Sequence, residues 1–474
     1  MTSTIRRLLA TATVAPALAV ALAATPPPAG AETPIPIPTV TGPVASVTPG
    51  DPSRDYTFLA TPIALVARGY VEEEFFISGT ACRYSGIGLS NATIAACGFP
   101  YKTRILVRRP ASAAAFNGTV IAEWQNVTAQ YDVDHYWLES SEHLMREGYA
   151  WVGISAQVSG IQPRPGEPLA LTINRLKAWS PARYGSLDVT AGGTVLDDGL
   201  RFDIFSQAVK SLRTPVDVDP LGPLDPVVVV AAGTSQSGTN LAAYHNSILP
   251  LYERVVDAFF LGESRGPLRT DLTVPVLRLL SEVDVAPTFA PADAPNYRHW
   301  EVAGASHADF GFINTIQPLL IRDQVVQFTP VCTRNPLSRI PKRYVYHAAW
   351  DALVDWVGSG ALPPVAPRIA YTIGATGPVI ARDADGNALG GIRLSEHQVP
   401  TAFNGTGNSG GLFCTLFGVH EPFGAERLAV LYRNHGHYVS QVARVNSANV
   451  RAGFLVPADS EESTANAAES SIGK

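Results

Sequence analysis

The sequence has no surplus of positive charge. Among its 474 residues, 41 Asp and Glu outnumber 35 Lys and Arg, and the net charge is −6 at pH 7. Proteins that bind nucleic acid or anionic membranes generally present an excess of Lys and Arg to the phosphate groups. The acidic balance therefore argues against nucleic acid and against an anionic membrane surface as partners.

After residue 31, we find no segment that predicts an integral membrane span. At the N-terminus, Arg6-Arg7 precede an apolar stretch from Leu8 to Ala24, and Ala29-Gly30-Ala31 supplies a small-residue cleavage site. This pattern is typical of an export signal. A transmembrane anchor is disfavoured because the stretch is short, rich in Ala and broken by Pro16. No cysteine follows the cleavage site, which argues against a lipoprotein. We expect residues 1–31 to be a signal peptide and the mature protein to be secreted or held in the cell envelope.

Cysteine is scarce, and the four cysteines match no zinc-binding spacing, so we predict no metal site. An even number of cysteines in an exported chain favours two disulfides over free thiols. Three pairings are open. We expect the one that joins near neighbours, which pairs Cys82 with Cys97 and Cys332 with Cys414.

Between residues 70 and 357, apolar runs typical of strands alternate with segments of helical periodicity. This alternation predicts an α/β fold, with a mostly parallel central sheet and helices on both faces. The predicted strands are Tyr70–Ser78, Thr103–Arg108, Asn117–Asn126 (a strand leading into a polar loop), Ala150–Ser155, Val227–Ala232, Val255–Leu261, Val274–Leu280 and His299–Val302. The predicted helices are Tyr136–Glu147, Phe202–Leu212 and Tyr344–Val357. The tryptophans of the last helix, Trp350 and Trp356, are expected to pack in the core.

Composition divides the rest of the chain. Residues 32–54, rich in Pro and Thr, predict an extended leader on the surface, ahead of one large domain over 55–458. Within that domain, residues 158–200 look like an insertion over a pocket, and 360–458 like a cap or irregular C-terminal lobe. The acidic tail from 459 to 474 is predicted to be disordered. The sequence contains no internal repeat.

The most informative motif is Gly233-Thr234-Ser235-Gln236-Ser237-Gly238, which lies between the buried strand Val227–Ala232 and a helix-like stretch. A strand, a tight turn that carries a serine, and a helix are the context of a nucleophile elbow, the signature of the α/β-hydrolase fold. Small neighbours are needed because the turn is strained. Gly233 meets that need, and Ser237 meets it less well than the usual glycine.

A serine nucleophile needs a histidine base and a carboxylate that orients it. In this fold they follow the serine in the order acid, then histidine, each after a strand. Asp284 stands just after the strand Val274–Leu280, and Glu282, two residues earlier, is an alternative acid. His307 follows the strand His299–Val302 and a glycine turn. Order and strand ends agree, so we predict a Ser235–Asp284–His307 triad.

The triad also needs two backbone N–H groups that stabilise the developing oxyanion. One is expected from Gln236, the residue after the nucleophile. The other is expected from the loop after an earlier strand, here Asn126 or Val127. Glycine-rich loops are common at that place, and this loop is not one.

Several of these segments resemble one known family. NGTVIAEWQNVT, REGYAWVGISAQ, SPARYGSLD, GTSQSG, LLSEVDV, HWEVAGASHADF and VNSANVRAGFLVPAD are similar to stretches of the exported bacterial α/β-hydrolase-domain proteins, over roughly residues 50–460. The resemblance implies a hydrolase fold and esterase chemistry, with Ser235 as nucleophile, His307 as base and the acid within Glu282–Asp284. It implies no substrate. Ser237 in the elbow is normal for this family.

Three other motifs favour ordinary structural roles. Gly407–Gly411, around Ser409, resembles a trypsin-like nucleophile loop, but it follows coil and that fold is all-β. Asp383–Asn387 fits a hairpin turn better than a calcium loop, since no liganding glutamate follows. His435 and His437 have no nearby carboxylate or cysteine partner for a metal.

The sequence therefore predicts an exported serine hydrolase that acts on a small-molecule or lipid-like ester. Triad chemistry requires no cofactor, so none is predicted. Two alternatives remain open: an acyltransferase that uses the same triad, and a non-catalytic binding protein with a hydrolase fold.

Overall fold

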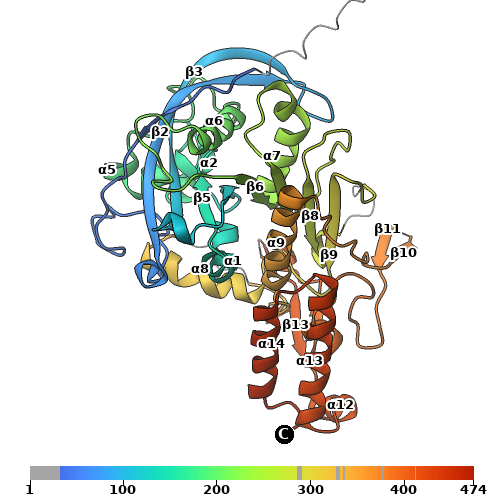
Figure 1. Cartoon of the computed structure of the whole chain (residues 1–474). Coiled ribbons are helices and arrows are strands. Elements are labelled where there is room, and N and C mark those ends of the chain that lie inside the picture. The colour runs from blue at the N-terminus through green and yellow to red at the C-terminus, as the bar shows by residue number, and fades with distance from the viewer. Residues whose placement is uncertain (1–32, 286–290, 327–330, 335–336, 376, 412) are drawn as a thin grey trace, which may run out of the picture.

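The computed structural model describes residues 33–285, 291–326, 331–334, 337–375, 377–411 and 413–474 (Figure 1). The predicted signal peptide, residues 1–31, lies outside these ranges. At the centre is a nine-stranded sheet with the order β1-β2-β3-β5-β4-β6-β7-β8-β9. Its strands are β1 (Thr39–Thr41), β2 (Tyr70–Ser85), β3 (Thr93–Pro110), β4 (Thr119–Trp124), β5 (Ala150–Ile154), β6 (Val228–Thr234), β7 (Ala258–Gly262), β8 (Val276–Ser281) and β9 (Tyr297–Val302).

The sheet is mostly parallel, as the alternation of strands and helices predicts. Strands β4 to β9 pair with one another in parallel, and β1, β2 and β3 add an antiparallel edge. Parallel neighbours need crossover connections, and most of these are helical here. The longer helices around the sheet are α1 (His135–Arg146), α6 (Arg201–Arg213), α7 (Ser235–Ala243), α8 (Phe310–Arg322) and α9 (Arg343–Ser359).

Alternate residues of each central strand enter different hydrophobic clusters on the two faces of the sheet. On β6, Val229 and Ala231 pack in the cluster that contains α6 and α7, whereas Val228 and Val230 pack in the cluster that contains α1 and α9. This period of two is the geometry of a strand covered on both faces. Trp350 and Trp356, predicted to lie in the core, are 0% and 6% exposed.

The antiparallel edge is larger than the sequence predicts. Strands β2 and β3 form one long hairpin that arches over the sheet, and the Cys82–Cys97 disulfide joins its arms (Figure 1). The leader, described from residue 33, lies along this edge through β1, with Val40 buried. Residues 158–200 contain four short helices: α2 (Val158–Ile161), α3 (Leu169–Thr172), α4 (Leu176–Trp179) and α5 (Pro181–Tyr184).

The C-terminal part carries small hairpins and a pair of helices. Its elements are β10 (Tyr371–Gly374), β11 (Gly377–Ile380), α10 (Ser395–Gln398), β12 (Ala402–Gly405), α11 (Cys414–Phe417), β13 (Val419–Pro422), α12 (Ala425–Leu431), α13 (His435–Ala452) and α14 (Pro457–Glu469). The second predicted disulfide, Cys332–Cys414, is also present.

The prediction of a disordered tail over 459–474 is wrong. Most of this segment belongs to α14, which lies beside α13 (Figure 1). Pro457 starts the helix, and the buried Asp459 accepts a hydrogen bond from the His347 ring of α9 at 2.7 Å. Ala467 packs in a small cluster with Val442 of α13. These contacts compensate for the conformational entropy that the segment loses when it becomes ordered. The composition of the segment alone does not reveal such contacts.

Candidate active site

Ser235 lies at the junction of β6 and α7, and its φ is +55°. Few non-glycine residues adopt this left-handed conformation, and it costs roughly 1 kcal/mol in an L-residue. Two glycines make room for the turn. A Cβ on Gly233 would lie 2.9 Å from the Ser237 carbonyl carbon, and one on Gly238 would lie 2.8 Å from the Gly233 oxygen. The serine is thus held in the strained turn that a nucleophile elbow requires.

Ser237, the departure from the usual glycine, stabilises the same turn. Its Oγ accepts a hydrogen bond from the Thr234 N–H at 3.0 Å and donates to the Thr234 carbonyl at 2.9 Å. The side chain is fully buried. A serine is tolerated here because its hydroxyl forms hydrogen bonds with Thr234, the residue that precedes Ser235.

His307 and Asp284 form the second half of the site. His307 follows β9 and a turn at Gly304, whose φ is +74°. Its Nδ1 lies 2.9 Å from Oδ2 and 3.1 Å from Oδ1 of Asp284. Because Asp284 occupies Nδ1, the proton of the neutral ring belongs on that nitrogen, and Nε2 remains as the acceptor.

Asp284 is buried yet ionised. The Ser281 hydroxyl donates to its Oδ2 at 2.6 Å, and Arg265 lies 3.3 Å from its Oδ1. Burial acts to raise the pKa of Asp284, but the interactions with His307, Ser281 and Arg265 outweigh it, and the net pKa is lowered. A carboxylate that stays charged can hold an imidazole and stabilise its protonated form.

Glu282, the alternative acid, is engaged elsewhere. Its Oε2 accepts from the Gly304 N–H at 2.7 Å, and its Oε1 pairs with Arg382 at 2.7 Å. It therefore braces the turn that leads to His307, and Asp284 is the carboxylate that contacts the ring.

Ser235 and His307 follow β6 and β9, and the carboxyl ends of parallel strands meet at one edge of a sheet. Within the described part of the chain, no hydrogen bond joins their side chains. A nucleophile–base hydrogen bond is often long in the absence of substrate and tightens when substrate binds.

For the oxyanion site, the prediction of Asn126 as a backbone donor is wrong. Its N–H already donates to the Val133 carbonyl at 3.1 Å, in a two-residue bridge that also pairs the Val133 N–H with Asn126. The Asn126 amide instead donates to the Thr234 carbonyl at 2.9 Å and ties this loop to the elbow. The backbone N–H groups of Val127 and Gln236 have no partner among the described residues, so these two remain candidates.

Sequence reasoning missed three side chains of the site. Gln157, just after β5, accepts from the amide of Gln236 at 2.8 Å, and Arg265 contacts Asp284. Lys342 donates to the main-chain oxygen of His307 at 2.7 Å. Gln157 and Arg265 follow strand ends at the carboxyl edge of the sheet, a positional signal that could have found them. Lys342 follows no such signal.

The structure agrees with ordinary roles for the other motifs. The Ser409 hydroxyl lies on an exposed loop, 2.8 Å from the Thr333 hydroxyl. The Asp383 carboxylate accepts from the N–H groups of Asp385 and Asn387, which closes a hairpin turn. The His435 ring nitrogens lie 2.8 and 3.0 Å from carbonyl oxygens after and within α14. In the described ranges, no three His, Cys, Asp or Glu side chains cluster as a metal site would need.

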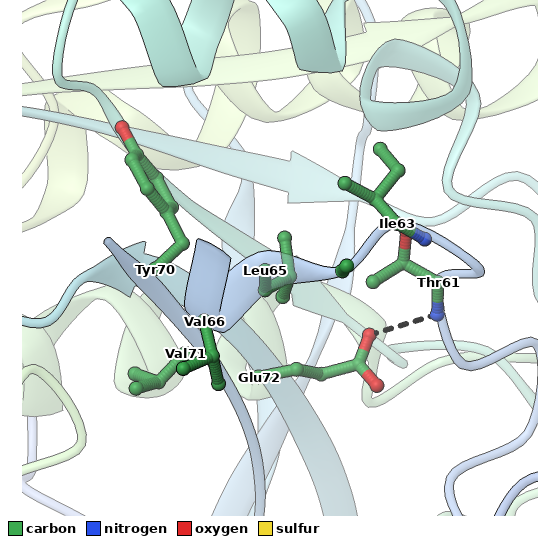
Figure 2. A pocket seen from close by; sticks show the side chains of 8 residues that line it. Thr61, Ile63, Leu65, Val66, Tyr70, Val71 and Glu72 are labelled. Carbon is green, nitrogen blue, oxygen red and sulfur yellow. Dashed lines mark hydrogen bonds between the residues drawn. The ribbon is translucent and has the colours of Figure 1, made fainter. Parts of the chain in front are cut away.

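One open cavity, of about 500 Å³, lies at the start of β2 (Figure 2). Its lining is mostly apolar, and the Glu72 carboxylate accepts from the Thr61 N–H at 3.1 Å (Figure 2). No hydrogen bond or ion pair among the described residues joins its lining to Ser235, Asp284 or His307. Across the described ranges, no helix combines the length and the apolar character that crossing a bilayer requires.

A family model described as an alpha/beta hydrolase domain matches residues 36–465. No curated protein matches the chain. Among solved structures, it is similar to a cold-adapted esterase from an Arctic intertidal metagenomic library, with 13% identity over 54% of this chain and 95% of that one and a TM-score of 0.28. A serine hydrolase without a lid from Xanthomonas campestris is 14% identical over 53% of this chain and 97% of that one, with a TM-score of 0.28. For a PNB esterase the values are 13% identity and a TM-score of 0.21, and the match covers 34% of this chain and 28% of that one.

Proposed function

Because the chain belongs to the alpha/beta hydrolase domain family, we propose that it is an exported serine hydrolase that cleaves carboxylic esters. The observation that carries the proposal is the left-handed φ of Ser235 on a strand-to-helix turn. It is supported by the hydrogen-bonded pair of Asp284 and His307 after neighbouring strands of the same sheet. Together these residues make up the three parts of an acyl-transfer site.

In the proposed mechanism, Nε2 of His307 removes the hydroxyl proton of Ser235 as Oγ attacks the carbonyl carbon of the ester. Asp284 stabilises the imidazolium that forms. The N–H groups of Gln236 and Val127 stabilise the tetrahedral oxyanion. His307 then gives its proton to the departing alcohol, which leaves an acyl group on Ser235. Water, deprotonated by His307, attacks the acyl carbonyl carbon. The bond from that carbon to Oγ then breaks, His307 returns its proton to Oγ, and the acid is released.

The polar residues beside the elbow suggest where the substrate lies. The amides of Gln236 and Asn240, on successive turns of α7, both donate to the Gln157 amide oxygen, at 2.8 and 3.2 Å. Arg201, just after the 158–200 segment, donates to Asn240 at 2.9 Å. We therefore expect residues 158–200 to cover the substrate, a small-molecule or lipid-like ester, on this side.

Export rests on the predicted signal peptide and on two disulfides that cross-link the described chain. Disulfides persist in oxidising compartments and are rare in the bacterial cytosol. The same chemistry in an acyltransferase would exclude water from the acyl-enzyme. Product analysis with and without an added alcohol distinguishes hydrolysis from transfer.

A fluorophosphonate probe tests the nucleophile directly, because it reacts covalently with an activated serine. We expect the wild-type protein to be labelled and the Ser235→Ala variant not to be. Ser409→Ala is the matched control, since Ser409 belongs to the formally similar Gly407–Gly411 motif but is exposed, and among the described residues its hydroxyl contacts only that of Thr333. Labelling that disappears with Ser409→Ala would assign the wrong serine, and no labelling at all would favour a binding protein.

The substrate class can be tested with a series of p-nitrophenyl esters of increasing acyl length on the purified mature protein. Turnover of at least one ester, lost in Ser235→Ala, is the expected result. The chain length at which kcat/KM is greatest would report the size of the acyl pocket. If Ser235 is labelled but no ester is hydrolysed, the result would favour an acyltransferase over an esterase.

A further inference from the structure

A cluster of charged side chains lies buried behind the elbow and the histidine loop, and the mechanism above does not use it. Its members are Lys342 before α9, Glu263 after β7, and His135 and Glu139 on α1, none more than 6% exposed. Charged groups are seldom buried without partners, because their desolvation is costly. The contacts made by these residues therefore call for an explanation.

Lys342 is the centre of the cluster. Its side chain is fully buried, and Nζ donates to the main-chain oxygen of His307 at 2.7 Å. The same nitrogen lies 3.3 Å from Oε1 of Glu263 and 3.6 Å from Oε1 of Glu139. The ammonium thus fixes the backbone of the predicted base while two carboxylates hold the ammonium.

Glu263 carries the connection to the nucleophile. Its Oε2 accepts a hydrogen bond from the hydroxyl of Thr234 at 2.7 Å and another from the hydroxyl of Tyr346 at 2.7 Å. Thr234 is the residue immediately before Ser235. Three polar contacts in series, His307 to Lys342, Lys342 to Glu263 and Glu263 to Thr234, therefore link the His307 loop to the elbow. The two segments lie some seventy positions apart in the chain.

We propose that Lys342 and Glu263 are positioning residues, which set the distance and orientation between the Ser235 hydroxyl and the His307 ring. The proposal rests on the proposed function, since it assigns a role relative to that triad. Both side chains are buried. Both act on the main chain or on the neighbour of a catalytic residue.

The charged groups around Lys342 favour the protonated form of its side chain. Burial acts to lower the pKa of Lys342, but Glu263 and Glu139 outweigh it, and the pKa is raised. Burial lowers the pKa of His135 to about 3, so this ring is neutral beside Glu139. Lys342 is therefore a cation at neutral pH.

The expected effect is on kcat. Displacement of a catalytic group by about 1 Å can cost roughly 10²-fold in rate, whereas substrate affinity depends on other contacts. Lys342→Met keeps most of the length of the side chain and removes its donors. We expect it to lower kcat and the rate of fluorophosphonate labelling by about 10 to 100-fold, with KM within about threefold of wild type.

The experiment compares five variants with the wild type for kcat, KM, labelling rate and thermal unfolding. Lys210→Met is the control, because Lys210 pairs with Glu253 at 2.8 Å on α6, away from the site, and should leave activity unchanged. Glu263→Gln keeps a partner for Thr234 but removes a charge. Lys342→Met combined with Glu263→Gln removes both charges, and should regain stability without regaining kcat.

Thr234→Val covers the outcome in which Lys342→Met does not fold. It removes the hydroxyl that donates a hydrogen bond to Glu263 and leaves Lys342 in place. We expect kcat to fall by about tenfold. Wild-type labelling and kcat in folded Lys342→Met, or in Thr234→Val if that variant alone folds, would overturn the positioning role. So would a double variant whose kcat recovers together with its stability. If Ser235 is not labelled in the wild type, the proposed function itself fails.

Discussion

The identity of the triad acid can be tested by two substitutions that differ only in which carboxylate they remove. Asp284→Asn keeps the size of the side chain but replaces one oxygen by an NH₂ group. In the wild-type structure, Nδ1 of His307 lies 3.1 and 2.9 Å from the two carboxylate oxygens of Asp284. If the new NH₂ group faces Nδ1, the ring must carry its proton on Nε2, and it can no longer accept the proton of Ser235.

The size of the loss follows from that change of tautomer and from the missing negative charge. In a serine triad, the equivalent change lowers kcat by about 10³ to 10⁴-fold, which corresponds to about 4 to 5.5 kcal/mol of transition-state stabilisation. Unfolding should change much less. The Ser281 hydroxyl can still donate to the remaining oxygen, and Arg265, which loses its charged partner, is half exposed.

Glu282→Gln is the matched control, because Glu282 lies two residues away and contacts Gly304 and Arg382 in place of the ring. A glutamine oxygen can still accept from the Gly304 N–H, so kcat should stay within about tenfold of wild type. Both variants are assayed on the same short p-nitrophenyl ester, with thermal unfolding as a check on folding. If Glu282→Gln loses as much as Asp284→Asn, or if Asp284→Asn keeps its rate, the assignment of the acid is wrong.

Three further predictions concern stability. In urea titrations, the free energy of unfolding of Ser235→Gly should exceed that of Ser235→Ala by about 1 kcal/mol, because only glycine adopts a φ of +55° without strain. Equal free energies of unfolding would contradict a strained elbow. Burial lowers the pKa of His245 to about 4, so the stability that this neutral ring contributes is present above about pH 6.5 and is lost as the pH falls toward 4. In urea titrations, the free energy of unfolding of His245→Leu should therefore fall by about 2 kcal/mol less than that of the wild type between pH 7 and pH 5. The same pH dependence in both proteins would refute this. Removal of the Cys332–Cys414 disulfide, which closes 82 residues, should cost about 4.5 kcal/mol, against about 3 kcal/mol for Cys82–Cys97, which closes 15. Calorimetry on the two double Cys→Ser variants compares them, and the reverse order would contradict the loop-closure argument.

The positions of Ser235, Asp284 and His307 after strand ends are the features of the candidate site that the sequence predicts most directly. His307 follows a buried strand that includes Arg298, His299 and Glu301, so the glycine turn after it is the clearer signal. Ser235 follows an apolar run that is buried on both faces, and such a run is recognisable in a single sequence. Asp284 follows the same rule. The two disulfides join cysteines whose pairing was expected from their proximity in the chain.

The errors arise where a long-range contact decides the outcome. Asn126 fails as an oxyanion donor because its N–H pairs with Val133 across a short loop, and nothing in the loop sequence indicates that bridge. The tail over 459–474 is ordered because Asp459 meets His347, which lies 112 residues earlier in the chain. Composition correctly describes a polar, Ala-rich segment, but composition does not tell whether another helix is there to receive it.

Lys342 illustrates the same limit at the centre of the molecule. A lone lysine in a loop is expected on the surface, since lysine is among the residues least often buried. It is fully buried here because a carbonyl oxygen and two carboxylates, from three separate segments, converge on its ammonium group. The groups that would carry out the chemistry are thus encoded near strand ends, where a single sequence shows them. The groups that would position the catalytic residues come together from separate segments, and only the folded chain shows this. A search for sequence motifs around Ser235 and His307 would therefore not find Lys342.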